Sequence, residues 1–121
     1  MDMNMLTQKS IEAVKNAEQI AIDHDHMEIQ PEHLLLALLT QENGVVGRLF
    51  ERLGKNTYPI TQELKGDIDN MPSVTGPGRE PGKVYISRDT DKIMNEAYKE
   101  AKKMEDQYIS VEHLLLGFYS L

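Results

Sequence analysis

The sequence predicts an all-α domain built from a duplicated helical repeat, and three observations carry this prediction. The block Glu-His-Leu-Leu-Leu at positions 32–36 returns unchanged at 112–116. A gapless shift of 80 positions aligns the residues before each block as well, and these residues have helical spacing. The aligned pairs are Leu6 with Ile86, Thr7 with Ser87, Ala17 with Ala97, Ala21 with Ala101, and Ile29 with Ile109.

The first helix of each copy is predicted to begin just after a hydroxyl residue. Thr7 and Ser87 each follow an apolar residue and precede a helical pattern, as N-cap side chains do when they accept a bond from a free backbone N–H. Small and apolar residues then recur on one helix face, which allows a neighbouring helix to approach closely. These stripes are Val14, Ala17 and Ala21 in the first copy, and Met94, Ala97, Ala101 and Met104 in the second.

The second helix of each copy is predicted to start near Pro31 and near Ser110. Proline is tolerated in the first turn, where its missing N–H costs nothing, and serine is a good N-cap. Glu32 and Glu112 fall in the first turn, where a carboxylate interacts favourably with the helix dipole. The residues that follow are apolar on every side, so we expect this pair of helices to be buried at the centre of the fold.

Two further helices complete the first copy. One spans Val45 to Leu53 and ends at Gly54; the other runs from Pro59 to about Asn70. A segment rich in proline and glycine follows and reads as a linker. The second copy stops before any counterpart of these two helices, so we expect a fragment of a longer protein. The expected organisation is a first repeat at 1–70, a linker at 71–85 and an incomplete second repeat at 86–121.

Composition narrows the class of partner. The formal net charge is −7, with thirteen basic residues scattered among twenty acidic ones, which argues against nucleic acid as a partner. The longest apolar run has six residues, and the first six residues do not resemble a signal peptide, so neither a membrane span nor export is expected. The chain has no cysteine, which excludes disulfides and cysteine-based zinc sites and is compatible with the cytoplasm.

Two segments that resemble chemical motifs are better explained as structure. The stretch from Gly76 to Val84 resembles a phosphate-binding loop, but Pro77 stands where its first glycine is required and Val84 where serine or threonine is required. We therefore expect a linker and no bound nucleotide. The run Asp23-His24-Asp25-His26 is read as a polar helix end leading into a turn, because no further ligands follow at metal-site spacing.

No catalytic arrangement is predicted. His33 and His113 fall three residues inside helices that we expect to be buried, so hydrogen-bonded structural histidines are the favoured reading. No spacing indicates a nucleophilic triad or a pair of catalytic carboxylates. The sequence therefore favours a binding module over an enzyme, with no metal and no cofactor held by this chain.

At the level of whole motifs, the sequence resembles the N-terminal (Clp-N) domain of the ClpB-type protein disaggregases, which are AAA+ proteins. The resemblance covers essentially the whole chain. It is carried by Leu6-Thr7-Gln8-Lys9, Ala17, Ala21, Pro31, His33-Leu34 with Ala37-Leu38-Leu39, Leu53-Gly54, Pro72-Ser73-Val74-Thr75-Gly76 and Tyr108-Ile109-Ser110-Val111-Glu112.

This resemblance implies a pseudo-two-fold domain that is joined by a linker to two ATPase modules of a homohexamer. ATP and Mg²⁺ would bind those downstream modules and not this chain. The implied role is to engage unfolded or aggregated polypeptide and pass it to the central pore. Family positions that contact the substrate carry over onto Thr7, Asp106 and Glu112.

A second branch of the family remains open. The Glu-His pairs at 32–33 and 112–113 are similar to those of ClpC-type unfoldases, in which paired glutamates help to bind adaptors or phosphorylated arginine. That similarity adds Glu32 to the candidate site and leaves an adaptor-docking domain of a ClpC- or ClpA-type protease partner as the alternative. Stabilisation of the helix dipole and contact with a ligand are both open for Glu32 and Glu112.

Overall fold

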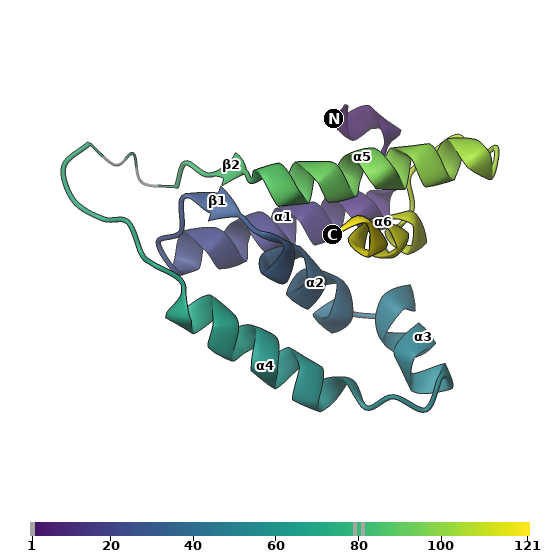
Figure 1. Ribbon diagram of the computed structural model, residues 1–121, viewed down its shortest axis with the longest axis horizontal. Coiled ribbons are helices and arrows are strands. Elements are labelled where there is room, and N and C mark those ends of the chain that lie inside the picture. The colour runs from purple at the N-terminus through teal and green to yellow at the C-terminus, as the bar shows by residue number, and fades with distance from the viewer. Residues whose placement is uncertain (1, 79, 81) are drawn as a thin grey trace.

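The computed structural model describes residues 2–78, 80 and 82–121 and confirms an all-α domain with a pseudo-two-fold repeat (Figure 1). Short 3-10 turns and one small parallel sheet accompany the helices. The elements are η1 Met3–Met5, α1 Gln8–Asp23, β1 Glu28–Ile29, α2 Pro31–Thr40, α3 Val45–Arg52, α4 Thr57–Asn70, β2 Tyr85–Ile86, α5 Arg88–Lys103, α6 Val111–Gly117 and η2 Phe118–Ser120.

Helices α1 and α5 begin where the sequence predicts. The Thr7 hydroxyl oxygen accepts from the Ser10 N–H at 3.2 Å, and the Ser87 hydroxyl oxygen accepts from the Thr90 N–H at 3.1 Å. Both N-caps are therefore confirmed. The predicted small residues are buried on both helices: Ala17 and Ala97 are each 0% exposed.

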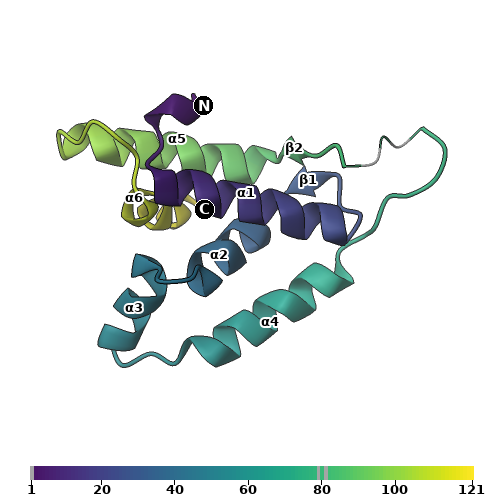
Figure 2. The same cartoon turned by 180° about the vertical axis from the view of Figure 1, so that it is seen from behind.

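Helix α2 lies between α5 on one side and α4 on the other, as both views of the ribbon show (Figures 1 and 2). It also packs against α1 of its own repeat. Helix α6 repeats this arrangement, since it packs against α5 of its own repeat and α1 of the other. Each second helix thus contacts the first helices of both repeats, which places the core between the two repeats.

Complete burial is confirmed for most of α2 but is wrong for the end of the second copy. In α2, Leu34 and Leu38 are buried and only Leu35 of the leucines is half-buried. In the second copy Leu114 is buried, whereas Leu115 and Leu116 are half-buried and Tyr119 is 85% exposed. The reason is that α4 covers the outer side of α2, and no element of the described chain takes that place over α6.

Helix α3 ends as predicted, with Leu53 as the C-cap and Gly54 in the left-handed region at φ +74°. Helix α4 begins two residues before Pro59, because the side chain of Asn56 caps it by accepting from the Tyr58 N–H at 3.0 Å. Its inner face carries Leu64 and Ile68, which are both buried.

Two parallel backbone pairings join the repeats, and the sequence patterns did not predict them. Strand β1 pairs with β2, with Glu28 opposite Tyr85 and Ile29 opposite Ile86. A single bridge pairs Leu6 with Ile109. Under the shift of 80 positions these pairings exchange roles, since Leu6 corresponds to Ile86 and Ile109 to Ile29. The backbone leading into each first helix therefore pairs with the backbone leading into the second helix of the other repeat.

The connection between α4 and β2 returns along the first repeat. The Val74 N–H donates to the Asp25 carbonyl at 2.8 Å, and the Ser73 hydroxyl donates to the His24 carbonyl at 3.0 Å. Tyr85, the last residue of the predicted linker, already belongs to β2. Arg79 and Pro81 of that linker, and Met1 at the start of the chain, lie outside the described residues. Within the described part of the chain, none of the helices combines the length and apolar character that crossing a bilayer requires.

Candidate functional site

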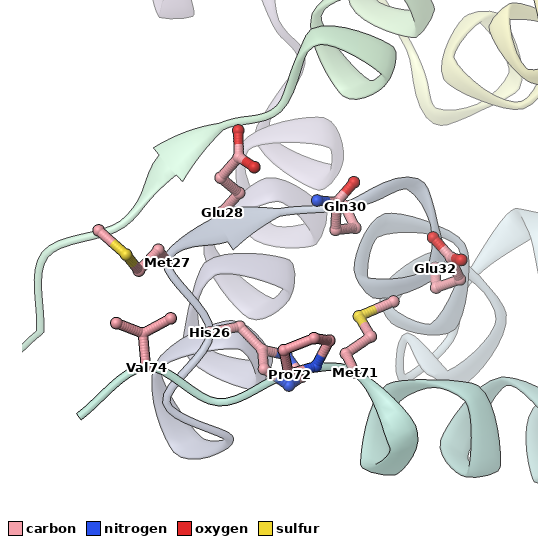
Figure 3. Close-up of a pocket in the computed structure, with 8 residues that line it drawn as sticks. All are labelled: His26, Met27, Glu28, Gln30, Glu32, Met71, Pro72 and Val74. Carbon is pink, nitrogen blue, oxygen red and sulfur yellow. The ribbon is translucent and has the colours of Figure 1, made fainter.

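Two surface depressions lie at the N-terminal ends of α2 and α6, and the shift of 80 positions relates them to each other. We call them the first-repeat pocket and the second-repeat pocket. The first-repeat pocket is lined by His26, Met27, Glu28, Gln30, Glu32, Met71, Pro72 and Val74 (Figure 3). The second-repeat pocket is lined by Met104, Asp106, Gln107, Tyr108, Ser110, Glu112, His113 and Leu116.

The second-repeat pocket brings together two of the predicted site residues, Asp106 and Glu112. Asp106 lies in the turn between α5 and α6, where its backbone N–H donates to the Ala101 carbonyl at 2.9 Å. Glu112 lies in the first turn of α6 with its side chain exposed. Two carboxylates therefore face solvent around one helix N-terminus, where they favour a cationic or hydrogen-bond-donating ligand.

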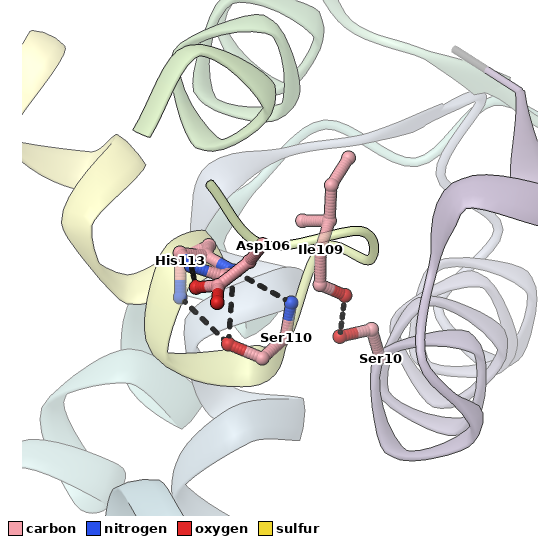
Figure 4. Close-up of polar contacts among 5 residues, drawn as sticks. All are labelled: Ser10, Asp106, Ile109, Ser110 and His113. Carbon is pink, nitrogen blue, oxygen red and sulfur yellow. Dashed lines mark hydrogen bonds and ion pairs between the residues drawn. The ribbon is translucent and has the colours of Figure 1, made fainter. Parts of the chain in front are cut away.

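His113 orients Asp106 within this pocket (Figure 4). Its Nδ1 accepts from the Ser110 N–H at 2.9 Å, so the proton of the neutral ring is on Nε2. That Nε2–H donates to the Asp106 carboxylate at 2.9 Å. His113 is 3% exposed, which agrees with the predicted structural histidine. Its function here is to hold Asp106 in place.

Thr7 lines a separate depression next to the second-repeat pocket. A neighbouring depression, lined by Met3, Asn4, Leu6, Thr7, Gln8, Ile11 and Tyr108, shares the Tyr108 side chain with the second-repeat pocket. The backbone places Thr7 here, because its N–H donates to the Ile109 carbonyl at 3.0 Å. Thr7, Asp106 and Glu112 thus line two depressions that share the exposed Tyr108.

Glu32 is not brought to this surface. It lines the first-repeat pocket, at the position that corresponds to Glu112. The surroundings differ, because Met71, Pro72 and Val74 of the segment after α4 form one wall of this pocket (Figure 3). The described residues around the second-repeat pocket include no such wall. The four candidate residues therefore divide into a group of three and a separate Glu32.

His26, which lines the first-repeat pocket, belongs to a histidine pair that the sequence patterns did not predict. Helix α1 ends at Asp23 and a turn follows with Asp25 at φ +57°, which fits the predicted polar helix end. His26, the last residue of the run Asp23-His24-Asp25-His26, differs from this prediction because it is only 4% exposed. Its Nδ1 lies 2.9 Å from Nε2 of His33. His26 corresponds to Asp106 and His33 to His113, so the repeat alignment could have identified the pair.

Burial and neighbouring rings affect the charge of this pair. Desolvation, followed by repulsion from His26 and then from His24, lowers the pKa of His33 from 6.5 to about 4. His33 is 0% exposed and is therefore a neutral hydrogen-bonding group near pH 7. Its Nδ1 accepts from the Gln30 N–H at 2.8 Å, which matches the bond between His113 and Ser110.

Within residues 2–78, 80 and 82–121, no three histidine or acidic side chains gather in a way that could hold a metal ion. The segment that resembles a phosphate-binding loop runs through Gly76, Gly78 and Gly82, all at positive φ, and its Arg79 and Pro81 lie outside the described residues.

Comparison with known proteins relates the chain to one family. The family described as "Clp repeat (R) N-terminal domain" matches residues 5–120. The chaperone protein ClpB of Bacillus cereus is 42% identical over 118 residues, which cover 98% of this chain and 14% of that protein. ClpB of Nitratidesulfovibrio vulgaris is 36% identical over 114 residues, covering 94% and 13%. The chain thus spans about 14% of the length of such relatives.

Solved structures show the same fold. The N-terminal domain of the ClpV1 ATPase from E. coli superposes with a TM-score of 0.84 at 26% identity, covering 94% of this chain and 67% of that one. The N-terminal domain of Hsp104 from Candida albicans gives 0.81 at 20% identity, covering 93% and 71%. A complex of a ClpV N-domain with a VipB peptide gives 0.72 at 19% identity, covering 94% and 67%. Since the family match runs through both copies of the duplicated unit, this chain belongs to the Clp repeat (R) N-terminal domain family.

Proposed function

We propose that this chain is the substrate-recognition domain of an ATP-dependent disaggregase of the ClpB type, binding unfolded or aggregated polypeptide. The observation that carries the proposal is the position of Tyr108, which is 53% exposed and is shared by two adjacent depressions. Thr7 lines one of these depressions, and Asp106 and Glu112 line the other.

The chemistry of this surface suits weak and general binding of unfolded chains. Met3 and Met104, at 38% and 53% exposure, extend the apolar area on either side of Tyr108. Methionine adapts its shape to unrelated apolar partners because its side chain is flexible and polarisable. The acidic rim favours segments in which apolar residues adjoin lysine or arginine. Binding that is adaptable and reversible suits a chaperone that must release many different chains.

Several parts of this proposal concern the longer protein. The curated relatives are chaperones about seven times the length of this chain, and we place ATP and Mg²⁺ in modules outside it. A homohexamer in the cytoplasm belongs to the same proposal. The ClpV N-domain with a bound VipB peptide supports peptide binding as a use of this fold.

The test compares two double variants that remove equal charge. Asp106→Asn with Glu112→Gln is preferable to charge reversal, because an asparagine oxygen still accepts from His113 Nε2–H. The control is Glu63→Gln with Asp67→Asn, two exposed positions on α4. Fluorescence anisotropy with a labelled, permanently unfolded protein reports binding, and circular dichroism reports helicity. We expect weaker binding for the first pair only. Equal binding by both pairs would remove Asp106 and Glu112 from the site.

A second candidate is an adaptor- or phosphoarginine-binding domain of a ClpC- or ClpA-type unfoldase. It is favoured by one observation: Glu32 and Glu112 occupy corresponding positions in two corresponding pockets. Free phosphoarginine distinguishes the candidates. Under this second function it binds with two sites per chain, and Glu32→Gln and Glu112→Gln each remove one site. Under the first function it does not displace the unfolded protein.

A further inference from the structure

The four histidines of the chain all lie at the N-terminal ends of α2 and α6 or beside them, and the two repeats use them differently. In the first repeat, His33 bonds to a second histidine, His26. In the second repeat, His113 bonds to a carboxylate, Asp106. Both His33 and His113 accept a backbone N–H at Nδ1, from Gln30 and Ser110. The two repeats therefore differ in the partner of Nε2, and the Ser110 hydroxyl also lies 3.0 Å from His113 Nδ1.

The His26–His33 pair has no position for an additional proton. His33 Nδ1 is occupied as an acceptor, so its Nε2–H donates to His26 Nδ1. A proton added to His26 Nδ1 would place two N–H groups opposite each other. A proton added to His33 Nδ1 would face the Gln30 N–H. Either protonation breaks one of the two hydrogen bonds, and both rings are almost fully buried.

A proton on His113 Nδ1 would also displace the Ser110 N–H, but the Asp106–His113 pair has a carboxylate and a hydroxyl that compensate for the lost bond. A protonated His113 keeps its Nε2–H bond to Asp106, and the bond becomes a charge-assisted one. Nδ1 lies 3.0 Å from the Ser110 hydroxyl oxygen, which can accept the new Nδ1–H. The carboxylate is half exposed and in contact with solvent. The second repeat therefore tolerates acid where the first does not.

We propose that the His26–His33 pair is an acid-sensitive latch on the first-repeat pocket, and that uptake of a proton opens this pocket while the second-repeat pocket keeps its shape. His26 itself lines the first-repeat pocket, and His33 lies in the first turn of α2 beside Glu32. Opening the pair exposes a charged imidazole in that pocket and loosens the start of α2. The latch does not depend on which ligand the pocket binds.

Charged and titratable groups face the pair from each element that surrounds it. His24, at the end of α1, stacks on His26 with ring centroids 5.5 Å apart and bonds to Asp69 of α4 at 3.2 Å. Glu28 of β1 and Glu32 of α2 line the pocket together with His26, Asp69 of α4 bonds to His24, and Asp23 and Asp25 adjoin His24 in the sequence. These carboxylates attract an imidazolium once it leaves the interior.

The size of the effect follows from the low pKa of His33, which is about 4 in the closed pair. An opened ring returns to its ordinary pKa of about 6.5 and takes up a proton at pH 5. The open form is therefore favoured on the order of 30-fold more at pH 5.0 than at pH 7.5. This change is large enough to measure residue by residue.

Hydrogen exchange with NMR detection tests the latch on the whole chain. The Leu34 N–H bonds to the Gln30 carbonyl, and the corresponding Leu114 N–H bonds to the Ser110 carbonyl. Protection factors, corrected for intrinsic exchange, are compared at pH 7.5 and pH 5.0. We expect protection of Leu34 to fall on the order of 30-fold and that of Leu114 to fall less than about threefold. Equal changes at the two amides would overturn the proposal.

Two substitutions that exchange the histidine partners between the repeats, and one direct observation of the histidine protons, complete the test. His26→Asp gives the first repeat the partner of the second, and the loss of Leu34 protection at pH 5.0 should disappear. Asp106→His makes the reverse exchange and should transfer the loss to Leu114. If either variant fails to fold, the NMR spectrum of the histidine rings in the unaltered chain tests the proposal. At pH 7.5 His33 must carry its proton on Nε2, and a proton on Nδ1 would refute the latch.

Discussion

The hydroxyl of Ser10 donates a hydrogen bond to the carbonyl of Ile109 at 2.9 Å, across 99 positions of sequence (Figure 4). The corresponding bond in the other direction joins the Thr90 hydroxyl to the Ile29 carbonyl at 2.8 Å. Both donors belong to the first turn of a first helix, and both acceptors lie just before a second helix of the opposite repeat. These two buried bonds tie the repeats together at both ends.

Removing either hydroxyl should therefore destabilise the whole domain. We expect Ser10→Ala and Thr90→Val each to lower the free energy of unfolding by about 1–3 kcal/mol, because each weakens a buried bond. Both variants should still unfold in a single urea transition followed by circular dichroism. Ser73→Ala removes an exposed bond of the same kind and should change stability by less than about 0.5 kcal/mol. A biphasic transition in either core variant would show that the repeats unfold separately.

The contact between α5 and α6 should not tolerate a side chain at Gly117. A Cβ added there would lie 2.3 Å from the Ile93 carbonyl oxygen, so the backbones would have to move apart. We expect Gly117→Ala to destabilise the domain by about 2 kcal/mol or more. The matched change is Gly66→Ala at an exposed position of α4, where an added Cβ meets nothing within 4 Å. That substitution should stabilise by about 0.5–1 kcal/mol, and thermal melting measures both effects.

The free energy of unfolding should decrease as the pH is lowered, because of His33. Its folded-state pKa of about 4 lies below the unfolded value of 6.5, so the unfolded chain binds more protons between these values. The contribution of His33 is complete above pH 6.5 and is lost as the pH falls towards 4. At pH 5.0 we expect a loss of about 2 kcal/mol relative to pH 7.5 from this group. Urea unfolding at the two pH values measures it, with His33→Gln as the variant that should lack this part of the dependence.

Thr7 has a structural task that must be separated from any contact with substrate. Its hydroxyl caps α1, so Thr7→Ala should cost about 1 kcal/mol of stability. Thr7→Ser keeps the capping oxygen and should change stability by less than about 0.5 kcal/mol. Binding of unfolded protein should therefore be measured with both variants. Unchanged binding by folded Thr7→Ala would contradict a direct contact through the hydroxyl.

The predictable parts of this fold are local ones. The caps at Thr7 and Ser87, the proline at the start of α2 and the glycine after α3 each depend on residues within one helical turn. The duplication added the long-range information that the two copies pack alike. The pairings of Leu6 with Ile109 and of β1 with β2 were not predicted, because segments this short show no periodicity.

The candidate site was predictable to a different degree. The repeat alignment and the family resemblance proposed Asp106, Glu112 and Glu32, and the structure places these residues in two corresponding pockets. Tyr108 was missed as a site residue, because its position between two depressions depends on the docking of Thr7 against Ile109. His26 was read as part of a polar turn, yet the segment after α4 folds back beside it and contributes to its burial.

The exchanged backbone pairings also have a consequence for assembly. Each pairing needs one backbone segment from the first repeat and one from the second. Nothing in its geometry requires that both segments come from the same molecule. The connection from Asn70 to Tyr85 favours the intramolecular form by keeping the two repeats at a high effective concentration. A variant whose connection is too short to span this distance should satisfy the same pairings between two molecules. Such a chain would form a domain-swapped dimer with its core intact.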